Sequence, residues 1–294
     1  MEFKIIEAII LGIIQGVTEF IPISSSAHLE VVPWLFNWTE ISKSFDLALH
    51  IGTLIALILF FFKEGIDLIK SGFALAIVKI SSKRNKDKKN KLKIDEHTTK
   101  SGTLFWYVIL ATIPAGLASF VLDKVSESII GDNTILRLCL IAIASIVMGV
   151  LLYIIDKKSA VEKTLDNATL KDVAIVGASQ AFAAVFPGVS RSGITITLSR
   201  GLNYDRKDSA KLSFFLSIPM ILAAVVFKFK EFDFTYPIPF FTGIIVSCIV
   251  GMIIINLLFK YLQNGNYKVF AIYRVCFGIA ILFAIVMRVL VSNS

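Results

Sequence analysis

Charged residues are scarce in this sequence. Of its 294 residues only 18% are Asp, Glu, Lys or Arg and 56% are hydrophobic, whereas a typical soluble domain carries roughly 25% charged residues. The mean hydropathy is +0.77. The short alternating segments of a transmembrane β-barrel are also missing from the sequence. Since a chain in lipid must satisfy its backbone hydrogen bonds within helices, the composition excludes an ordinary soluble domain and predicts an all-α integral membrane protein.

Cysteine is also scarce, with three residues in the chain. The three cysteines, Cys139, Cys248 and Cys276, all fall within apolar runs, and none stands at a CxxC or Cys/His spacing. Such spacings are the usual signature of zinc and redox sites. We therefore expect buried single thiols and not a metal or redox centre built on cysteine.

The charges that are present are unevenly distributed. The net charge is +8, and nine Lys or Arg residues against three acidic ones fall between Lys79 and Lys100, separating two apolar runs. A basic segment in this place is typical of a cytoplasmic loop, by the positive-inside rule, near anionic lipid. We therefore expect membrane lipid and not nucleic acid to be the partner of this charge.

Six apolar segments approach the length of about 20 residues that crosses a bilayer. A seventh segment, Gly65–Ile80, alternates charged and apolar residues at helical spacing, which predicts a helix lying at the membrane interface. The predicted spans are Phe45–Phe62, Thr103–Leu122, Ile135–Ile155, Leu212–Phe227, Pro237–Phe259 and Val269–Val291.

Two further apolar stretches, Ile5–Leu35 and Val173–Leu198, are interrupted near their middles by Pro, Ser and a charged residue. Non-helical backbone at membrane depth is tolerated only where protein or a water-filled cavity covers it. Each stretch therefore predicts a re-entrant hairpin of two short helices rather than a full span.

The two interrupted stretches also resemble each other. An ungapped alignment of Gly12–Ser26 with Gly177–Arg191 gives four identities in fifteen positions. The identical pairs are Gly12 with Gly177, Gln15 with Gln180, Pro22 with Pro187 and Ser25 with Ser190. Because each stretch also precedes a full span by a similar interval, the chain reads as two related halves.

Counting spans from the basic segment predicts how the halves are oriented. If residues 81–100 are cytoplasmic, the first hairpin starts outside and the second starts from the cytoplasm, an inverted arrangement found in many transporters. We therefore expect a single membrane domain over residues 1–294, with a first repeat at 1–80, linking spans at 101–156 and a second repeat at 172–294. The two hairpin tips would then meet near the membrane interior.

The first hairpin concentrates polar groups that are costly in an apolar environment unless they are paired or hydrated. Gln15 and Glu19 are four residues apart and share one helix face. Ser25 and His28 are three residues apart, close enough for the imidazole to take or return a hydroxyl proton. A one-residue shift of the helix would exchange Ser25 for Ser26, so the sequence leaves the nucleophile open between them.

The second hairpin contains the run PGVSRSGIT. Arg191 stands here among small hydroxyl and glycine residues, which suits a phosphate through the guanidinium fork, free backbone N–H groups and room for close approach. Ser190, Ser192 and Thr195 can add hydroxyl donors. A nucleophile with a histidine and an acid opposite an anion cradle is typical of phosphoryl transfer, and the apolar surroundings predict a substrate with a lipid tail.

At these residues the sequence resembles the undecaprenyl-diphosphate phosphatase family of bacteria, also called the bacitracin-resistance family. QGVTE at Gln15–Glu19 matches the motif (E/Q)xxxE, and FIPISSSAH at Phe20–His28 matches FxPxSSxxH. The motif PGxSRSG is met in full at Pro187–Gly193, and AIYR at Ala271–Arg274 is similar to the family's C-terminal segment. The agreement in order and spacing covers nearly the whole chain.

The resemblance implies an enzyme that hydrolyses undecaprenyl diphosphate to undecaprenyl phosphate and inorganic phosphate. This reaction recycles the lipid carrier of cell-wall precursors and gives resistance to bacitracin. The resemblance also implies an inverted-repeat fold with re-entrant helices in the bacterial plasma membrane, an active site open to the outer face, and a homodimer.

By position, the resemblance implies that Ser25 is the nucleophile, His28 its acid/base partner and Arg191 a clamp on the diphosphate. Glu19 would orient His28 or help to hold a divalent cation such as Mg²⁺ or Ca²⁺. Gln15 stands where many members have a carboxylate, which leaves the metal requirement open. The residues implied to contact or surround the phosphates are Gln15, Ser24, Ser26, Ser190, Ser192, Thr195 and Arg274, the last as a phosphate contact or a helix-end anchor.

Two other functions fit part of the pattern. Inverted halves with broken helices are also typical of a lipid-phosphate transporter or flippase, although a transport site needs no nucleophile. An intramembrane serine protease would use a Ser and a His, but peptide hydrolysis develops no phosphate-like charge for Arg191 to bind. The hydrolase is therefore the main prediction and the transporter the alternative.

Overall fold

The structure, a computed structural model, describes residues 5–38, 42–84, 94–131 and 133–292. These ranges are helical apart from turns and one isolated bridge between Lys163 and Tyr204, so the predicted all-α class is confirmed. The helices are α1 (Ile5–Thr18), α2 (Ser25–Phe36), α3 (Lys43–Phe60), α4 (Phe62–Arg84), α5 (Glu96–Ile130), α6 (Thr134–Lys158), α7 (Leu170–Ala178), α8 (Gln180–Val185), α9 (Arg191–Gly201), α10 (Arg206–Phe227), α11 (Pro237–Tyr261) and α12 (Lys268–Ser292), with 3₁₀ turns η1 (Leu165–Asn167) and η2 (Phe229–Glu231).

Six helices of the described chain are long and apolar enough to cross a membrane: α3, α5, α6, α10, α11 and α12. They fall where the six spans were predicted, and the chain is a multi-pass membrane protein. Helix α5 extends beyond its predicted end at Leu122 as far as Ile130. The reason is local, because no proline or glycine follows Leu122 until Gly131, which has a φ of 56° and so suits the end of a helix.

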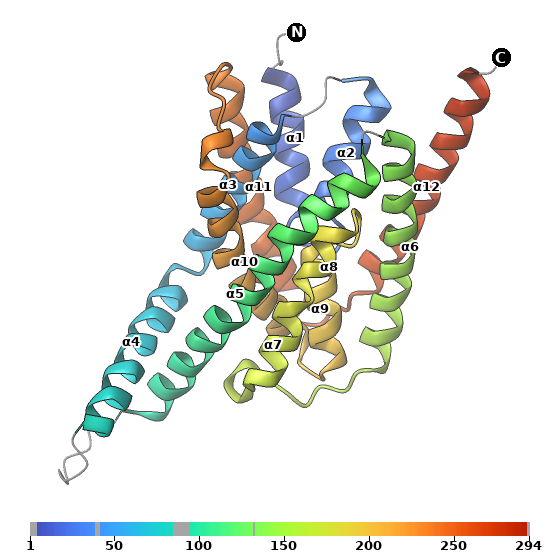
Figure 1. Cartoon of the computed structure of the whole chain (residues 1–294). Helices are drawn as coiled ribbons and strands as arrows, with labels where there is room; N and C mark the ends of the chain where they lie inside the picture. The colour runs from blue at the N-terminus through green and yellow to red at the C-terminus, as the bar shows by residue number, and fades with distance from the viewer. Residues whose placement is uncertain (1–4, 39–41, 85–93, 132, 293–294) are drawn as a thin grey trace.

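The predicted helix at Gly65–Ile80 is present as part of α4, which follows α3 after Phe61 alone. It packs against α5 through small residues: a Cβ at Gly72 would lie 2.3 Å from the Phe105 ring, and one at Gly102 would lie 2.5 Å from the Ser71 carbonyl oxygen. Figure 1 shows α4 beside the first part of α5, away from the remaining bundle, whereas the second part of α5 packs on α7 and α8. The placement of α4 at a membrane interface stays a prediction, and most of the basic loop predicted at 81–100 lies outside the described residues.

Both interrupted stretches break where expected. The first forms α1 and α2, and the second forms α9 preceded by α7 and α8, so it contains three helices where two were predicted. Helix α7 stops at Ala178 because the Ser179 hydroxyl donates to the Val176 carbonyl oxygen at 2.6 Å, a local bond that competes with the helical pattern. The re-entrant course of these helices through a membrane stays a prediction.

The two breaks have the same backbone design. Ser24 and Ser190 have positive φ angles of 78° and 71°, and each caps the following helix by accepting a backbone N–H three residues on, from Ala27 and Gly193 respectively. The ungapped alignment, which placed Ser25 over Ser190, is therefore wrong by one residue at the tip. The second tip is longer by one residue, since two residues separate Pro187 from Ser190 and one separates Pro22 from Ser24.

The helices that lead to the two breaks enter the bundle from opposite ends, as the predicted inversion of the halves requires. In Figure 1, α1 runs inward from the end that carries both chain termini, whereas α7 and α8 run inward from the opposite end. Helix α1 packs on α11, and α7 and α8 pack on α5. The aligned glycines make these contacts, because a Cβ at Gly12 would lie 2.9 Å from Val246 Cβ and one at Gly177 would lie 2.7 Å from Ala111 Cβ. Helices α6 and α12 also pack against each other.

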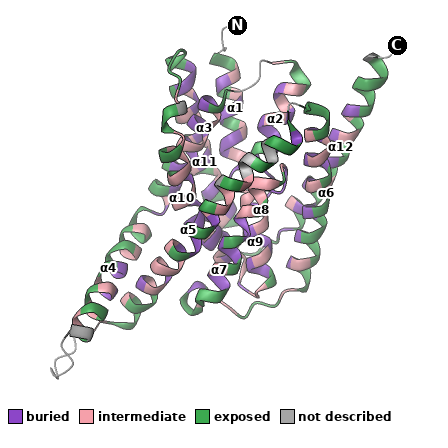
Figure 2. Cartoon of the chain, in the orientation of Figure 1, coloured by how far each residue is buried: buried purple, intermediate pink, exposed green. Residues whose placement is uncertain are grey.

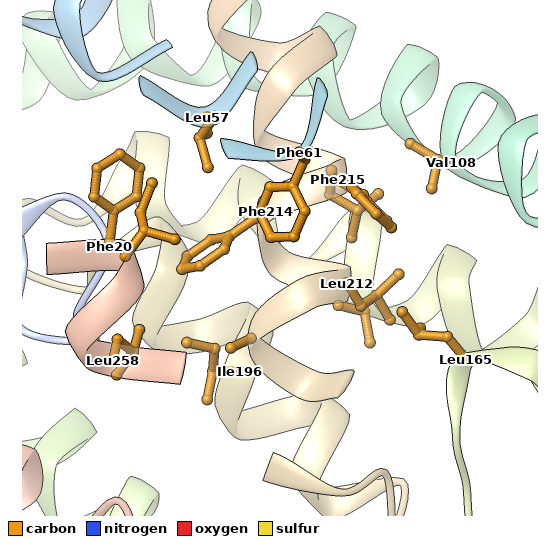
Figure 3. Close-up of a cluster of buried hydrophobic side chains, with 14 of the residues drawn as sticks. Phe20, Leu57, Phe61, Val108, Leu165, Ile196, Leu212, Phe214, Phe215 and Leu258 are labelled. Carbon is orange, nitrogen blue, oxygen red and sulfur yellow. The ribbon is translucent and has the colours of Figure 1, made fainter. Parts of the chain in front are cut away.

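The core lies where the first tip meets the long helices. Phe20, just after α1, packs edge-on against Phe214 of α10 with ring centroids 5.5 Å apart, and Phe61 packs against Phe215 at 5.3 Å. Figure 3 shows these aromatic rings in one buried cluster with Leu57 and other aliphatic side chains. Figure 2 shows buried residues toward the centre of the bundle and exposed ones along the outer helix faces, as expected where lipid covers apolar side chains.

A buried ion cluster joins four segments at the end of α9. Asp156 of α6 accepts hydrogen bonds from Arg200 Nε at 2.7 Å, from Arg206 Nε at 2.9 Å and from the Tyr267 backbone N–H at 3.1 Å. The other Arg200 nitrogens donate to backbone carbonyl oxygens, including that of Ser159 at 3.1 Å. Because every part of this guanidinium is bonded within the protein, the cluster is a structural joint between α6, α9, α10 and α12.

Candidate functional site

The two helix breaks meet at the carboxylate of Glu19. Its Oε2 accepts the Ser25 hydroxyl at 2.6 Å and the Gln15 amide at 3.1 Å, and its Oε1 accepts a hydrogen bond from Arg191 Nη2. The carboxylate is only 6% exposed, so its charge is balanced inside the protein by Arg191. The structure therefore brings together Gln15, Glu19, Ser25 and Arg191, residues predicted from separate halves of the chain.

The serines beside these residues differ in their partners. Ser25 bonds to Glu19, whereas Ser26 Oγ lies 3.3 Å from Ser24 Oγ. Ser190 and Ser192 form a matching hydroxyl pair at 3.3 Å in the second tip. The sequence left Ser25 and Ser26 as alternatives, and only Ser25 of the two is bonded to the carboxylate in the described structure.

A cavity of about 430 Å³ opens beside Glu19. Helices α2 and α9 both begin at it, so the positive ends of two helix dipoles and their free first-turn N–H groups face one space. Its polar lining is Glu19, Ser24, Ser25, Ser26, Lys43, Asp46, His50, Ser119, Gln180, Ser190, Arg191, Ser192 and Lys228. Its remaining lining is apolar and comes mainly from α5, α8 and α10: Gly116, Ala183, Ala184, Met220, Ile221, Ala223, Ala224 and Phe227, with Leu47 of α3. The cavity suits an anionic head with an apolar tail.

His28 does not meet Ser25, contrary to the predicted proton exchange between them. Its Nδ1 lies 2.7 Å from the Ser24 carbonyl oxygen and its Nε2 lies 2.7 Å from the Tyr273 hydroxyl. The ring stacks on Phe277 with centroids 4.1 Å apart. Since the carbonyl can only accept, Nδ1 donates to it and Nε2 accepts from Tyr273. One nitrogen is therefore engaged by Tyr273 of α12 and the other by the Ser24 backbone, and His28 is not among the residues that line the cavity.

Arg274 and Thr195 also lie outside the cavity lining. Arg274 is fully buried and donates to the carbonyl oxygens of Pro22 in the first tip, at 3.0 Å, and of Gly188 and Val189 in the second, at 2.7 and 3.0 Å. It therefore ties the two tips together, which fits its predicted role as an anchor and not as a phosphate contact. Thr195 exchanges a hydrogen bond with the Ser213 hydroxyl of α10 at 2.7 Å.

Sequence reasoning missed His50 and Asp46 of α3. His50 Nε2 lies 3.6 Å from Glu19 Oε2, and both residues line the cavity. The signal was available: an acid and a histidine four residues apart, inside an apolar span, are functional candidates by default. Gln180 was paired with Gln15 in the repeat but given no role, and it also lines the cavity.

The described residues contain no preformed set of protein ligands for the expected divalent cation. Among the described residues, no three His, Cys, Asp or Glu side chains are grouped closely enough to hold one. Both oxygens of Glu19 already accept hydrogen bonds, and the buried, unpartnered Gln15 Oε1 adds a single oxygen. Because Mg²⁺ is usually held by one or two carboxylates together with waters and substrate phosphates, these protein groups alone do not form a complete cation site, and a metal requirement stays a prediction.

Known proteins match this chain over nearly its whole length. The family model for bacitracin resistance protein BacA matches residues 8–280. The undecaprenyl-diphosphatase of Pelotomaculum thermopropionicum is 39% identical over 279 residues, which are 95% of this chain and 96% of that protein. The undecaprenyl-diphosphatase of Moorella thermoacetica is 37% identical over 92% of this chain and 94% of its own. That of Gemmatimonas aurantiaca is 36% identical over 96% and 98%.

Proposed function

Since the chain belongs to the family of bacitracin resistance protein BacA, we propose that it hydrolyses undecaprenyl diphosphate to undecaprenyl phosphate and inorganic phosphate in the membrane. The relatives that match it over nearly their full length are named for this activity. The reaction returns the lipid carrier of cell-wall precursors to use and gives resistance to bacitracin. The observation that carries the assignment is the bonded set of Ser25, Glu19 and Arg191 at a cavity lined by both polar and apolar side chains.

The anion cradle is the first component of the proposed mechanism. Arg191 and the first turns of α2 and α9 offer a guanidinium fork and backbone N–H groups to the phosphate oxygens. In the described structure Arg191 pairs with Glu19. When the diphosphate arrives, the guanidinium turns its donors to the phosphate charge, which leaves Glu19 freer to accept a proton.

The nucleophile is the second component. Ser25 Oγ attacks the terminal phosphorus and Glu19 Oε2, 2.6 Å away, takes its proton. A bond forms between Oγ and phosphorus, and the bond from phosphorus to the bridging oxygen breaks, so undecaprenyl phosphate leaves. Water then attacks the phosphoserine, which returns the Ser25 hydroxyl and releases inorganic phosphate. Glu19 replaces His28 as the group that exchanges a proton with Ser25.

The lipid tail and the membrane side are the third component. The small apolar side chains of α8 and α10, including Ala183, Ala184 and Ala223, line the cavity opposite Glu19 and leave room for a prenyl chain. Lys43, at the start of α3, and Lys228, at the end of α10, also line it. We place these ends at the outer face of the plasma membrane, following the orientation inferred from the basic segment, and we expect a homodimer from the family resemblance.

Phosphate release from undecaprenyl diphosphate by the detergent-purified protein tests the assignment. We expect release by the parent chain and a loss of at least about 10³-fold in Ser25→Ala and Arg191→Ala, the scale typical of a nucleophile or an arginine that stabilises a phosphoryl group. Ser26→Ala is the matched control and should keep most of the activity. A folded parent that releases no phosphate but moves the lipid across sealed vesicles would point to the transporter instead.

A further inference from the structure

We infer that His50 is the proton-relay residue of this site: it receives, through Glu19, the proton that Ser25 loses. The inference rests on the proposed hydrolysis and adds a residue that the motifs do not contain. His50 acts through Glu19 and is therefore a positioning and relay residue, distinct from Ser25 and Arg191, which touch the substrate.

The geometry places His50 directly behind the carboxylate. Its Nε2 lies 3.6 Å from Glu19 Oε2, the same oxygen that accepts the Ser25 hydroxyl at 2.6 Å. The imidazole is 23% exposed and lines the cavity. A proton on Glu19 Oε2 therefore has an acceptor within reach, and this acceptor has access to the cavity and hence to water.

The other ring nitrogen determines which atom faces Glu19. Nδ1 of His50 lies 2.9 Å from the Asp46 backbone carbonyl oxygen. A carbonyl only accepts, so Nδ1 carries the hydrogen and the neutral ring directs its lone pair at Nε2 toward Glu19. Nε2 of the neutral ring can therefore take a proton from Glu19 Oε2 once the two atoms approach to hydrogen-bond distance.

The charged groups around His50 are arranged for reversible protonation of the imidazole. The Asp46 carboxylate lies 3.8 Å from Nδ1, and Glu19 Oε2 lies 3.6 Å from Nε2 at the other ring nitrogen. Lys43 and Lys228 line the same cavity. Arg191 is paired with the same carboxylate that faces His50, so a guanidinium that moves onto the diphosphate changes the charge around His50 within the catalytic cycle.

The relay completes the proton balance of the reaction. As Ser25 Oγ bonds to phosphorus, its proton passes to Glu19 and on to His50 Nε2, while undecaprenyl phosphate leaves as an anion. Glu19 is then a carboxylate again and can take a proton from the attacking water. Glu19 passes this proton to Ser25 Oγ as the phosphoserine bond breaks, and the proton held on His50 leaves to water in the cavity.

His28 cannot replace His50 in this role. Its Nε2 accepts from the Tyr273 hydroxyl at 2.7 Å, its Nδ1 donates to Ser24, and it is 6% exposed. The two histidines therefore differ in their surroundings, because His50 has a ring nitrogen that faces the catalytic carboxylate and His28 does not.

Steady-state hydrolysis by His50→Gln, followed across pH, tests the inference. Glutamine keeps a polar group of similar length but holds no extra proton. We expect kcat to fall about 10–100-fold, at the lower end of the range for acid–base groups, with KM changed less than about twofold. We also expect the acid limb of the parent kcat profile, in the imidazole range of about pH 5–8, to disappear, while the Glu19 limb at lower pH remains. His97→Gln is the matched control, because its side chain is 73% exposed and lies next to Asp67, away from the cavity lining.

The outcomes separate the two proposals. A parent without phosphate release overturns the hydrolase and this inference together, whereas an active parent with unchanged rate and pH profile in His50→Gln overturns the relay alone. Tm and binding of a methylene-bridged diphosphate show whether His50→Gln is folded. If it is not folded, Asp46→Asn replaces it in the test. An acid limb of the kcat profile that moves to another pH, with KM as in the parent, supports the relay. An acid limb at the same pH as in the parent overturns it.

Discussion

Helix α9 carries a buried arginine–carboxylate pair at each end, and the two pairs differ in what surrounds them. At its first residue, Arg191 bonds to Glu19 and keeps 19% of its side chain exposed. Near its last turn, Arg200 bonds to Asp156 and is completely buried. Arg191 lines a cavity, and Arg200 donates from every nitrogen to groups of the protein.

The difference separates an arginine that binds a ligand from one that holds the fold. An arginine whose donors are all engaged by protein acceptors has none to offer a ligand, and removing its partner leaves a buried charge. An arginine that shares a carboxylate with a serine and faces open space can exchange that carboxylate for a phosphate. Burial and pairing alone would have ranked the Arg200 pair as the better candidate, so the open side of the pair is the feature that identifies function.

Removal of Asp156 should produce the largest effect on stability. Asp156→Ala leaves Arg200 and Arg206 without their shared carboxylate, and breaking a buried pair of this kind costs about 3–5 kcal/mol. We expect a strongly lowered Tm in detergent, with kcat of the folded fraction close to that of the parent. Asp166→Ala, near the same end of the bundle, is the control and should change stability by less than about 0.5 kcal/mol, as exposed substitutions do. A lost kcat with an intact Tm would reverse the roles given to the two pairs.

Replacement of Arg191 by lysine should produce the next largest effect, which is on kcat/KM and not on stability. Lysine keeps the charge but loses the planar fork that bonds two phosphate oxygens at once. We expect Arg191→Lys to lower kcat/KM about 100-fold, which corresponds to about 2.7 kcal/mol of transition-state stabilisation, with Tm little changed. Arg200→Lys is the matched variant and should show the opposite pattern. Equal losses of rate in both variants would contradict the comparison.

The sequence predicted the parts of this site that depend on periodicity and on local backbone chemistry. Apolar runs of about 20 residues placed the six spans, and the Pro, Ser and charged residues at Glu19–Ser26 and Pro187–Ser192 placed both breaks. The inversion of the halves then required the two tips to meet. Glu19, Ser25 and Arg191 were found in this way, although 172 residues separate Glu19 from Arg191.

The parts that depend on side-chain direction could not be predicted. Helical spacing put Ser25 and His28 on one face, but the His28 ring turns to Tyr273, which lies 245 residues away and could not be placed beforehand. His50 was overlooked because its partner Glu19 belongs to another segment. The extra residue of the second tip likewise depends on three-dimensional fit, since a Cβ at Gly188, where φ is 88°, would lie 2.7 Å from the Ile141 backbone.

The smallest effect concerns Asp172, a second carboxylate near the Arg200 end, outside the six spans. Burial alone would raise its pKa, but hydrogen bonds from Lys163 and Tyr204, both at 3.0 Å, lower the pKa below its usual value. A carboxyl with a lowered folded-state pKa contributes stability that is complete above its unfolded pKa, about 3.9, and is lost as pH falls through the folded value.

The Tm difference between the parent and Asp172→Asn should therefore be largest near neutral pH and should close as pH falls below about 4. Asp67→Asn, whose side chain is 46% exposed, is the control and should change Tm little. Asp172 and Asp156 would then both act on the fold and not on the rate, because the kcat of Asp172→Asn should match that of the parent at every pH where the protein is folded. A rate that changed with Asp172 would instead mean that the closed end of α9 is coupled to the cavity at its open end, and the separation drawn between the two arginines would be wrong.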